Sequence, residues 1–219
     1  LYEAYEVNHG QLPDAALIKA IILNTANDAG NKGPDFINGW GTINAHRAAL
    51  AIEEGRFIKG TIDQDIIRTH QIEIPDNVIQ ARIMTYWADR DGRVSPTQHL
   101  INNINTSVTD GNTLFLPWVL DHTPDPALLA KPATKGIDAK NNMEQVAIDN
   151  PASGMYTLEI NGAEIPFGEM QYYVVWEFRT SEIDVTYPNG GENVEKLARE
   201  TIHWDAEGLS LIHISEPTR

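Results

Sequence analysis

Cysteine is absent from the 219 residues, which excludes disulfides, thiolate nucleophiles and cysteine-ligated zinc and leaves calcium on oxygen ligands as the favoured metal. No apolar run approaches the ~20 residues of a membrane-spanning helix, so we expect no membrane segment. Basic residues are few, 16 against 31 acidic ones, for a formal charge of −15. This balance argues against nucleic acid or an anionic membrane as a partner.

Residues 1–55 have a helical pattern. Apolar residues between Leu17 and Thr25 recur at helical spacing after Pro13, and a loop rich in Gly and Asn follows over residues 27–42. Asn44 is placed to cap a second helix, which Gly55 would end. The first residues, from Leu1 on, have the pattern of a helix already under way, which indicates that the chain begins inside a longer protein.

From Phe57 to Phe178 the pattern changes to short β-prone runs separated by turn residues. Such runs without intervening helices indicate an antiparallel β-sandwich. The predicted strands are FIKGTI, IIRTHQIEI, VIQARIMTYW, LINNINTSV, TLFLPWVL, EQVAI, MYTLEI and QYYVVWEF.

Two runs in the first segment, ALIKAIILNTAND and GPDFINGWGTINAHRAAL, resemble the part of subtilisin-like serine proteases that follows the helix of the catalytic serine. The motifs YWADRDG, LPWVLD and IPFGEMQYYVVWEF continue, in order, a resemblance to the jelly-roll domain appended to some of these enzymes. The resemblance covers about residues 1–180. It implies that residues 1–55 are the incomplete end of an α/β catalytic domain and that residues 56–182 form an all-β jelly roll.

The same resemblance implies a secreted or cell-surface endopeptidase that hydrolyses protein or peptide substrates with a Ser/His/Asp triad. The family's serine lies in a Gly-Thr-Ser motif, and this sequence contains none. We therefore expect no catalytic residue in this chain and place the triad upstream of Leu1. Asn24 has two interpretations, an oxyanion donor or a helix cap, and its position at a helix end favours the cap.

Calcium is the expected cofactor, because the family's jelly rolls often bind it and because two loops group oxygen ligands. Relatives commonly have two carboxylates where this chain has the neutral amides of Asn103 and Asn105, so we expect a weaker site. A structural role in tight turns is the alternative for the asparagines at 141 and 142. The candidate ligands are Asp89, Asp91, Asn102, Asp138, Asn142 and Glu144.

Aromatic residues support a rival function, a non-catalytic module that binds carbohydrate or protein. Large aromatics on alternating strands more often fill a core than form a sugar-stacking platform. The residues concerned are Trp87, Trp118, Trp176, Tyr172 and Tyr173. A third hypothesis is an adhesive or spacer protein.

The C-terminal part divides in two. Residues 183–208, with the turn PNGGE between IDVTY and TIHW, resemble the incomplete start of an immunoglobulin-like repeat. Residues 209–219 resemble a translated sequencing adapter, so we exclude them from the fold; a genuine strand is the alternative. We also expect the helices of residues 1–55, lacking their own sheet, to expose an apolar patch.

Overall fold

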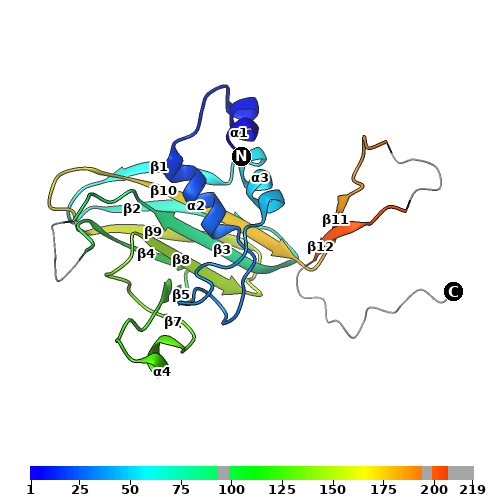
Figure 1. The fold of residues 1–219 in the computed structure, drawn as a ribbon. Helices are drawn as coiled ribbons and strands as arrows, with labels where there is room; N and C mark the ends of the chain where they lie inside the picture. The colour runs from blue at the N-terminus through cyan, green and yellow to red at the C-terminus, as the bar shows by residue number, and fades with distance from the viewer. Residues whose placement is uncertain (93–98, 194–198, 207–219) are drawn as a thin grey trace.

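The fold of the chain is given by a computed structural model that describes residues 1–92, 99–193 and 199–206. Figure 1 shows a β-sandwich with helices on one side and a separate hairpin at the C-terminal end. The predicted immunoglobulin-like start lies partly within these residues, whereas the predicted adapter tail, residues 209–219, lies outside them.

Two four-stranded antiparallel sheets form the sandwich, as the sequence predicts. Sheet I has the order β1-β10-β3-β8 and sheet II the order β2-β9-β4-β5, so successive strands alternate between the sheets from β1 to β4. The strands of sheet I are β1 (Phe57–Ile62), β3 (Val78–Tyr86), β8 (Met143–Asp149) and β10 (Met170–Thr180). Those of sheet II are β2 (Ile67–Ile74), β4 (Asn103–Thr109), β5 (Leu114–Phe115) and β9 (Gly154–Glu164).

The main core fills the space between the two sheets. Alternate residues of each strand face inward, because successive side chains of a β-strand point to opposite sides. Ile83 of β3 and Val146 of β8 meet Leu158 of β9 in one apolar cluster, and all three are fully buried. Trp87, directly after β3, belongs to the same cluster.

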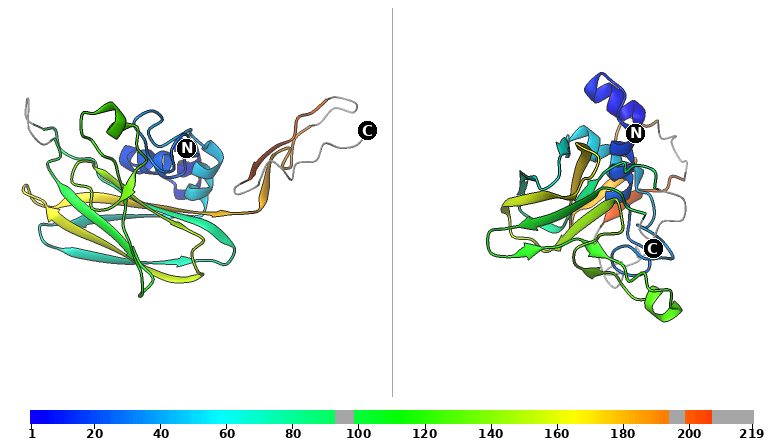
Figure 2. Two further views of the ribbon diagram at one scale, coloured as in Figure 1. Left: turned by 90° about the horizontal axis from the view of Figure 1, so that it is seen from below. Right: turned by 90° about the vertical axis from the view of Figure 1, so that its left-hand side faces the viewer.

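A second apolar cluster lies on the outer face of sheet I, under the helices α1 (Tyr2–His9), α2 (Ala15–Asn24) and α3 (Ala45–Glu53). Leu17 and Ile21 of α2 are buried there against Tyr173 and Val175 of β10. The two views of Figure 2 show the helices on one side of the sandwich. The expectation that these helices have no sheet to pack on is wrong for α2 and α3, whose apolar sides lie on sheet I, although Val7 of α1 and Leu12 after it are exposed.

Local signals place the helix ends as predicted. The side chain of Asn44 accepts a hydrogen bond from the Arg47 N–H at 3.0 Å and caps α3. Gly55, two residues beyond the last residue of α3, has a φ of 64°, in the left-handed region that glycine adopts freely. This turn leads the chain directly into β1.

Residues 117–136 leave the sandwich as a separate excursion. Two short strands, β6 (Trp118–Val119) and β7 (Thr134–Lys135), pair with each other, and the one-turn helix α4 (Pro126–Leu129) lies between them. The predicted single strand over 113–120 is thus divided into β5 and β6. Pro117 directly precedes β6 and has no N–H to donate to a strand ladder.

The strands β11 (Ile183–Tyr187) and β12 (His203–Ala206) form an antiparallel pair of their own. This hairpin stands apart from the sandwich (Figures 1 and 2). Ile183 and Trp204 are both more than half exposed. A two-stranded hairpin is marginally stable by itself.

Candidate functional site

Several buried oxygen atoms lie near one end of the sandwich without a hydrogen-bond partner in the part of the chain that the structure describes. Unpaired buried polar atoms are costly, so such a group indicates a bound ion, water or proton. The atoms belong to Thr85, Asn102, Asn103, Asn105, Thr106 and Glu144. Two of these residues, Asn102 and Glu144, are among the predicted calcium ligands.

Glu144 is the charged residue of this group. It points inward from β8, beside Val146, and only 1% of it is exposed. Its Oε2 accepts a hydrogen bond from the Thr106 N–H of β4 at 2.5 Å, whereas Oε1 has no described partner. Burial raises the pKa of this carboxyl to about 8, and the negative charge of Asp138 adds to the rise. At neutral pH it therefore holds a proton unless a cation neutralises it.

Asn102 reaches the same end of the core through Trp87. The indole N–H of Trp87 donates to the Asn102 carbonyl oxygen at 2.9 Å. The Asn142 side-chain amide donates to the Trp87 carbonyl oxygen at 2.7 Å. Trp87 therefore brings together two of the predicted ligands that lie 40 residues apart in the sequence.

The predicted aspartates have other partners. Both carboxylate oxygens of Asp89 accept hydrogen bonds from the residues before β4, including the Asn102 N–H at 3.0 Å. Asp138 accepts from the Lys140 N–H at 2.8 Å and from the Asn141 side chain at 2.6 Å. The contacts of Asp138 close a tight turn that includes Asn141, as the turn-forming alternative for that asparagine expects, whereas Asn142 bonds to the distant Trp87. Asp91 is exposed.

Asn103 and Asn105, where relatives have carboxylates, are separated from Glu144 by the strand itself. They alternate along β4 with Ile104 and Thr106, whose buried side chains face the core. The unpaired side-chain oxygens of Glu144 and Thr106 thus lie inside the sandwich, whereas those of Asn103 and Asn105 lie on the other side of β4. Sequence spacing by itself does not show this division.

The donor chemistry of the inner group fits calcium. The unpaired atoms are carboxylate, amide and hydroxyl oxygens, the ligands that hard cations prefer. Three or more His, Cys, Asp or Glu residues do not cluster anywhere in the described ranges. The inner group thus has one carboxylate, that of Glu144, and otherwise neutral oxygens.

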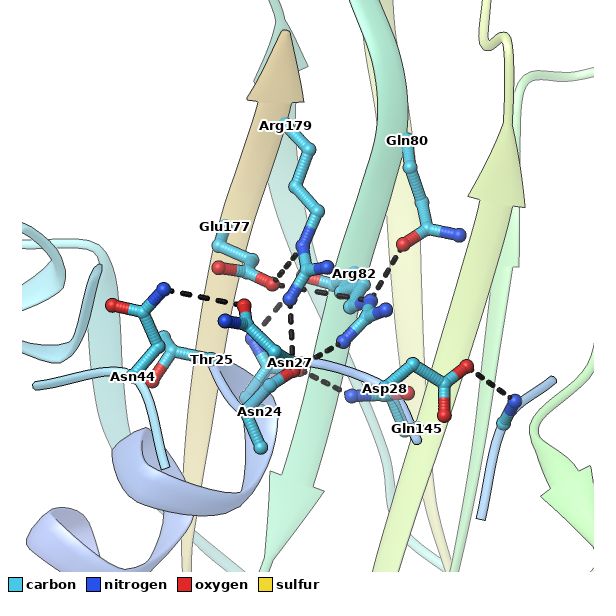
Figure 3. Close-up of polar contacts among 12 residues, drawn as sticks. Asn24, Thr25, Asn27, Asp28, Asn44, Gln80, Arg82, Gln145, Glu177 and Arg179 are labelled. Atoms are coloured by element: carbon cyan, nitrogen blue, oxygen red, sulfur yellow. Dashed lines mark hydrogen bonds and ion pairs between the residues drawn. The ribbon is translucent and has the colours of Figure 1, made fainter. Parts of the chain in front are cut away.

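A second polar group, which the sequence did not indicate, joins the helical segment to the outer face of sheet I (Figure 3). Arg82 of β3 and Arg179 of β10 each donate a hydrogen bond of 2.8 Å to the carbonyl oxygen of Ala26, just beyond α2. Glu177 lies between the two guanidinium groups, 2.8 Å from Arg179 and 3.9 Å from Arg82. All three charged side chains are nearly buried. We call these four residues the Ala26 clamp.

Asn24 adds to the joint beside the clamp. Its side-chain oxygen accepts from the Gln145 amide at 2.9 Å, and its amide donates to the Arg82 carbonyl oxygen at 3.4 Å. The preferred interpretation of Asn24 as a helix cap is therefore wrong, because its side chain bonds to the sheet instead. The signal that could have found this joint is the row of charged residues at alternate positions of β10, Glu177 and Arg179, on a strand otherwise buried.

The aromatic residues lie mainly in the interior. Trp87, Tyr172 and Tyr173 are at most 1% exposed, and Trp176 packs against the main core. Trp118 contacts Lys135, whose Nζ is 3.3 Å from the centre of the indole ring. A Cβ on Gly33 would come within 2.9 Å of the same indole. These positions do not form an exposed stacking platform for a sugar.

Comparisons with known proteins give no family. No family model and no curated protein matches the chain. A crystal structure of a protein from Sulfurospirillum deleyianum overlaps 55% of this chain and 97% of its own, at 8% identity and a TM-score of 0.29. A likeness of this size supports no inference about fold or function. No helix in residues 1–92, 99–193 and 199–206 is long and apolar enough to cross a membrane.

Proposed function

We propose that the chain is the C-terminal part of a secreted subtilisin-like serine endopeptidase. In this proposal residues 1–55 complete the α/β catalytic domain, and residues 56–182 are an accessory jelly roll that holds it. The observation behind it is the Ala26 clamp, through which the sandwich grips the end of the helix in the protease-like segment. Two buried guanidinium groups that donate to one carbonyl oxygen fix the position of that oxygen and of the helix end that carries it. An accessory domain that supports another domain requires such a fixed contact.

The strand order supports the jelly-roll part of the proposal. Numbered without β6 and β7, the eight sandwich strands have the orders 1-8-3-6 and 2-7-4-5. This order is that of two Greek keys, which is the arrangement of a jelly roll. The sandwich motifs on which the resemblance rests thus lie in a domain of the matching kind.

The chemistry would be peptide hydrolysis by a serine nucleophile, a histidine base and an orienting aspartate. We place all three N-terminal to Leu1 in the parent protein. This chain would contribute no reacting group; it would keep α2 and the following loop in position and bury an apolar side of the catalytic domain. Protein substrates would be cleaved outside the cell or at its surface.

We further propose calcium as a structural ligand of the sandwich, held by the inner oxygens of Asn102 and Glu144. Calcium would neutralise a carboxylate that the core otherwise keeps protonated, and would satisfy oxygens that lack partners. Its role would be to stabilise the sandwich, since Glu144 faces the core, on the side of sheet I opposite to the helices.

The test is to express the parent gene, including the codons upstream of Leu1, and to assay casein hydrolysis together with labelling by a fluorophosphonate. Hydrolysis with one labelled serine, lost on substitution of that serine by alanine, is the expected result. A parent that folds but neither cleaves casein nor labels would contradict the proposal and favour the binding-module alternative.

A further inference from the structure

A small cavity lies where the loop of residues 27–42 meets the excursion of residues 117–136 and the segment that follows β7. Its volume is about 90 Å³. A drug-sized molecule needs several times as much space, so the cavity has room for one short chain of atoms. The residues that give its wall a chemical character are Asp35, Trp40, Trp118, Leu120, Asp138 and Met143.

Two aspartates give this cavity a negative charge that its wall does not balance. Asp35 and Asp138 are only 4% and 3% exposed. Within the described part of the chain, the cavity is lined by no Lys, Arg or His, and neither carboxylate forms an ion pair. Neutral N–H donors, that of Asn38 most strongly, hold the pKa of Asp35 below its ordinary value. The cavity therefore favours a cation as its ligand.

The carboxylate of Asp138 has one acceptor position left. A carboxylate offers about four lone-pair sites. Two sites on Oδ1 accept from the backbone N–H groups of Lys140 and Asn141, at 2.8 and 3.3 Å, and one site on Oδ2 accepts from the Asn141 side-chain amide at 2.6 Å. Donors of its own loop occupy all four sites of Asp35. A ligand can thus donate one hydrogen bond to Asp138, while Asp35 contributes charge.

The apolar part of the wall suits an organic cation. The faces of indole rings attract ammonium groups, and this chain places the Lys135 Nζ 3.3 Å from the centre of the Trp118 ring. The second indole of the wall is held in place because the Trp40 N–H donates to the Met143 sulfur at 3.2 Å. Calcium takes about six to eight oxygen ligands, which a wall of indole, thioether and aliphatic groups does not supply.

We propose that this cavity, which we call the Asp138 cavity, binds the primary ammonium group of an alkylamine or of a lysine side chain. The ammonium would donate to the remaining acceptor position of Asp138 and lie beside the indole of Trp40, with its alkyl chain against Leu120 and Met143. A guanidinium group fits less well, because its planar fork pairs best with two carboxylate oxygens and one acceptor position remains. The inference does not depend on the protease proposal, since every residue that carries it belongs to this chain.

The experiment is isothermal titration calorimetry of the 219-residue chain with n-butylamine at pH 7, in a chelator so that calcium does not compete. For a ligand of this size we expect a Kd of about 1 mM. The comparison ligand is n-butanol, which has a similar shape and no charge and should not bind.

Two variants locate the bound amine. Asp138→Asn removes the charge of the acceptor and should weaken n-butylamine binding about tenfold. Because Asp138 also closes a turn, Trp40→Leu is the second variant, and it should weaken binding about twofold to fivefold through the loss of the indole face. The matched control is Asp14→Asn, which should not change the Kd, because Asp14 lines another cavity and pairs with Lys59 at 2.8 Å. The Tm of each variant reports whether it is folded.

Three results would overturn the inference. Equal binding of n-butylamine and n-butanol would show that the cavity selects shape and not charge. No binding well above the expected Kd would show that the cavity takes no amine. An unchanged Kd in a folded Asp138→Asn or Trp40→Leu variant would place the amine elsewhere on this acidic protein.

A blocked lysine, Nα-acetyl-lysine methylamide, separates the two sources of the ammonium group. If it binds as n-butylamine does, the Asp138 cavity is a site for lysine side chains of other proteins. If n-butylamine binds and the blocked lysine does not, the Asp138 cavity is a site for free alkylamines. Both results support an ammonium site.

Discussion

The two faces of sheet I are built from the same strands but in different ways. The inner face, against sheet II, is almost wholly apolar, with Ile83 and Val174 at its centre. The outer face, under the helices, is apolar near Tyr86 and Tyr173 and charged near Arg82 and Glu177. Both faces are buried, but the outer one buries three charged side chains that pair with one another, whereas the inner one buries a single carboxyl, that of Glu144, whose pKa burial raises.

The difference shows what each face has to specify. Apolar packing of the two sheets stabilises the sandwich. The register of its strands is fixed by the alternation of apolar and polar residues along each strand. A helical segment could slide over a uniformly apolar face, whereas the Ala26 carbonyl can accept from Arg82 and Arg179 in one position only. We infer that the charges of the outer face fix the position of α2, at a cost in desolvation.

Replacing the clamp carboxylate should have the largest effect. In Glu177→Gln the two guanidinium groups stay buried and lose their counter-charge, which we expect to lower the free energy of unfolding by about 3 to 5 kcal/mol. The matched control is Glu182→Gln, at an exposed position just after β10. Urea unfolding measures both, and a loss below about 1 kcal/mol would show that the charges are dispensable.

Cavities on the two faces test whether the helices and the sandwich unfold together. Ile83→Ala creates a cavity on the inner face of sheet I, and Ile21→Ala creates one between the helices and the outer face. Both positions are fully buried. Each should cost about 2 to 5 kcal/mol, in a single transition seen equally by tryptophan fluorescence and helical circular dichroism. If Ile21→Ala leaves the fluorescence transition unchanged, the helices form a separate unit.

Calcium and pH should act on the inner face through Glu144. Its pKa is raised from 4.5 to about 8, so the proton it retains stabilises the fold fully below pH 4.5. That stabilisation is lost progressively between pH 4.5 and about 8, because over this range the unfolded chain has released the proton that the folded chain still binds. In chelator, the Tm should therefore fall between pH 5 and pH 8, and Glu144→Gln should flatten the profile.

At pH 8, calcium at one hundred times its Kd should add about 2 to 3 kcal/mol to the wild-type chain. Differential scanning calorimetry with calcium, and with magnesium as the control, measures the gain. No gain in the wild type, or the same gain in Glu144→Gln, would contradict calcium at this site.

An exposed ion pair should have the smallest effect. Lys32 and Asp149 meet at 2.5 Å near the Ala26 clamp, but their side chains are 58% and 46% exposed. Lys32→Ala should therefore cost less than about 1 kcal/mol, and less still in high salt. If Lys32→Ala lowers the free energy of unfolding as much as Glu177→Gln does, burial does not determine how much an ion pair contributes to stability.

Most of the fold follows from the sequence pattern. The alternation in FIKGTI gives β1 over the predicted residues, and Asn44 and Gly55 mark the ends of the last helix. The structure confirms the predicted β-sandwich. The prediction was possible because the inner faces are apolar at every second residue, a signal that is local to each strand. The break between β5 and β6 was missed, although Pro117 stands in the predicted strand.

The candidate site was only partly predictable. Asn102 and Glu144 were among the candidate calcium ligands, and both have an unpaired buried oxygen. The separation of Asn103 and Asn105 from Glu144 by β4 depends on which way each side chain points. The charged residues Glu177 and Arg179 of β10 indicate a polar contact on that face. Its partners could not be predicted, because Ala26 and Arg82 are far away in the sequence and nothing local pairs a carbonyl with two distant guanidinium groups.

The sequence by itself determined the elements of this protein: the helices, the strands and the apolar side of each, since propensity, capping and alternation act within a few residues. Only the tertiary structure decided that sheet I receives α2 on its outer face, that its buried charges meet at Ala26, and that Asp35 and Asp138 line one cavity. Those outcomes depend on contacts between distant segments, where burial and hydrogen bonding select one arrangement among many that the local pattern permits.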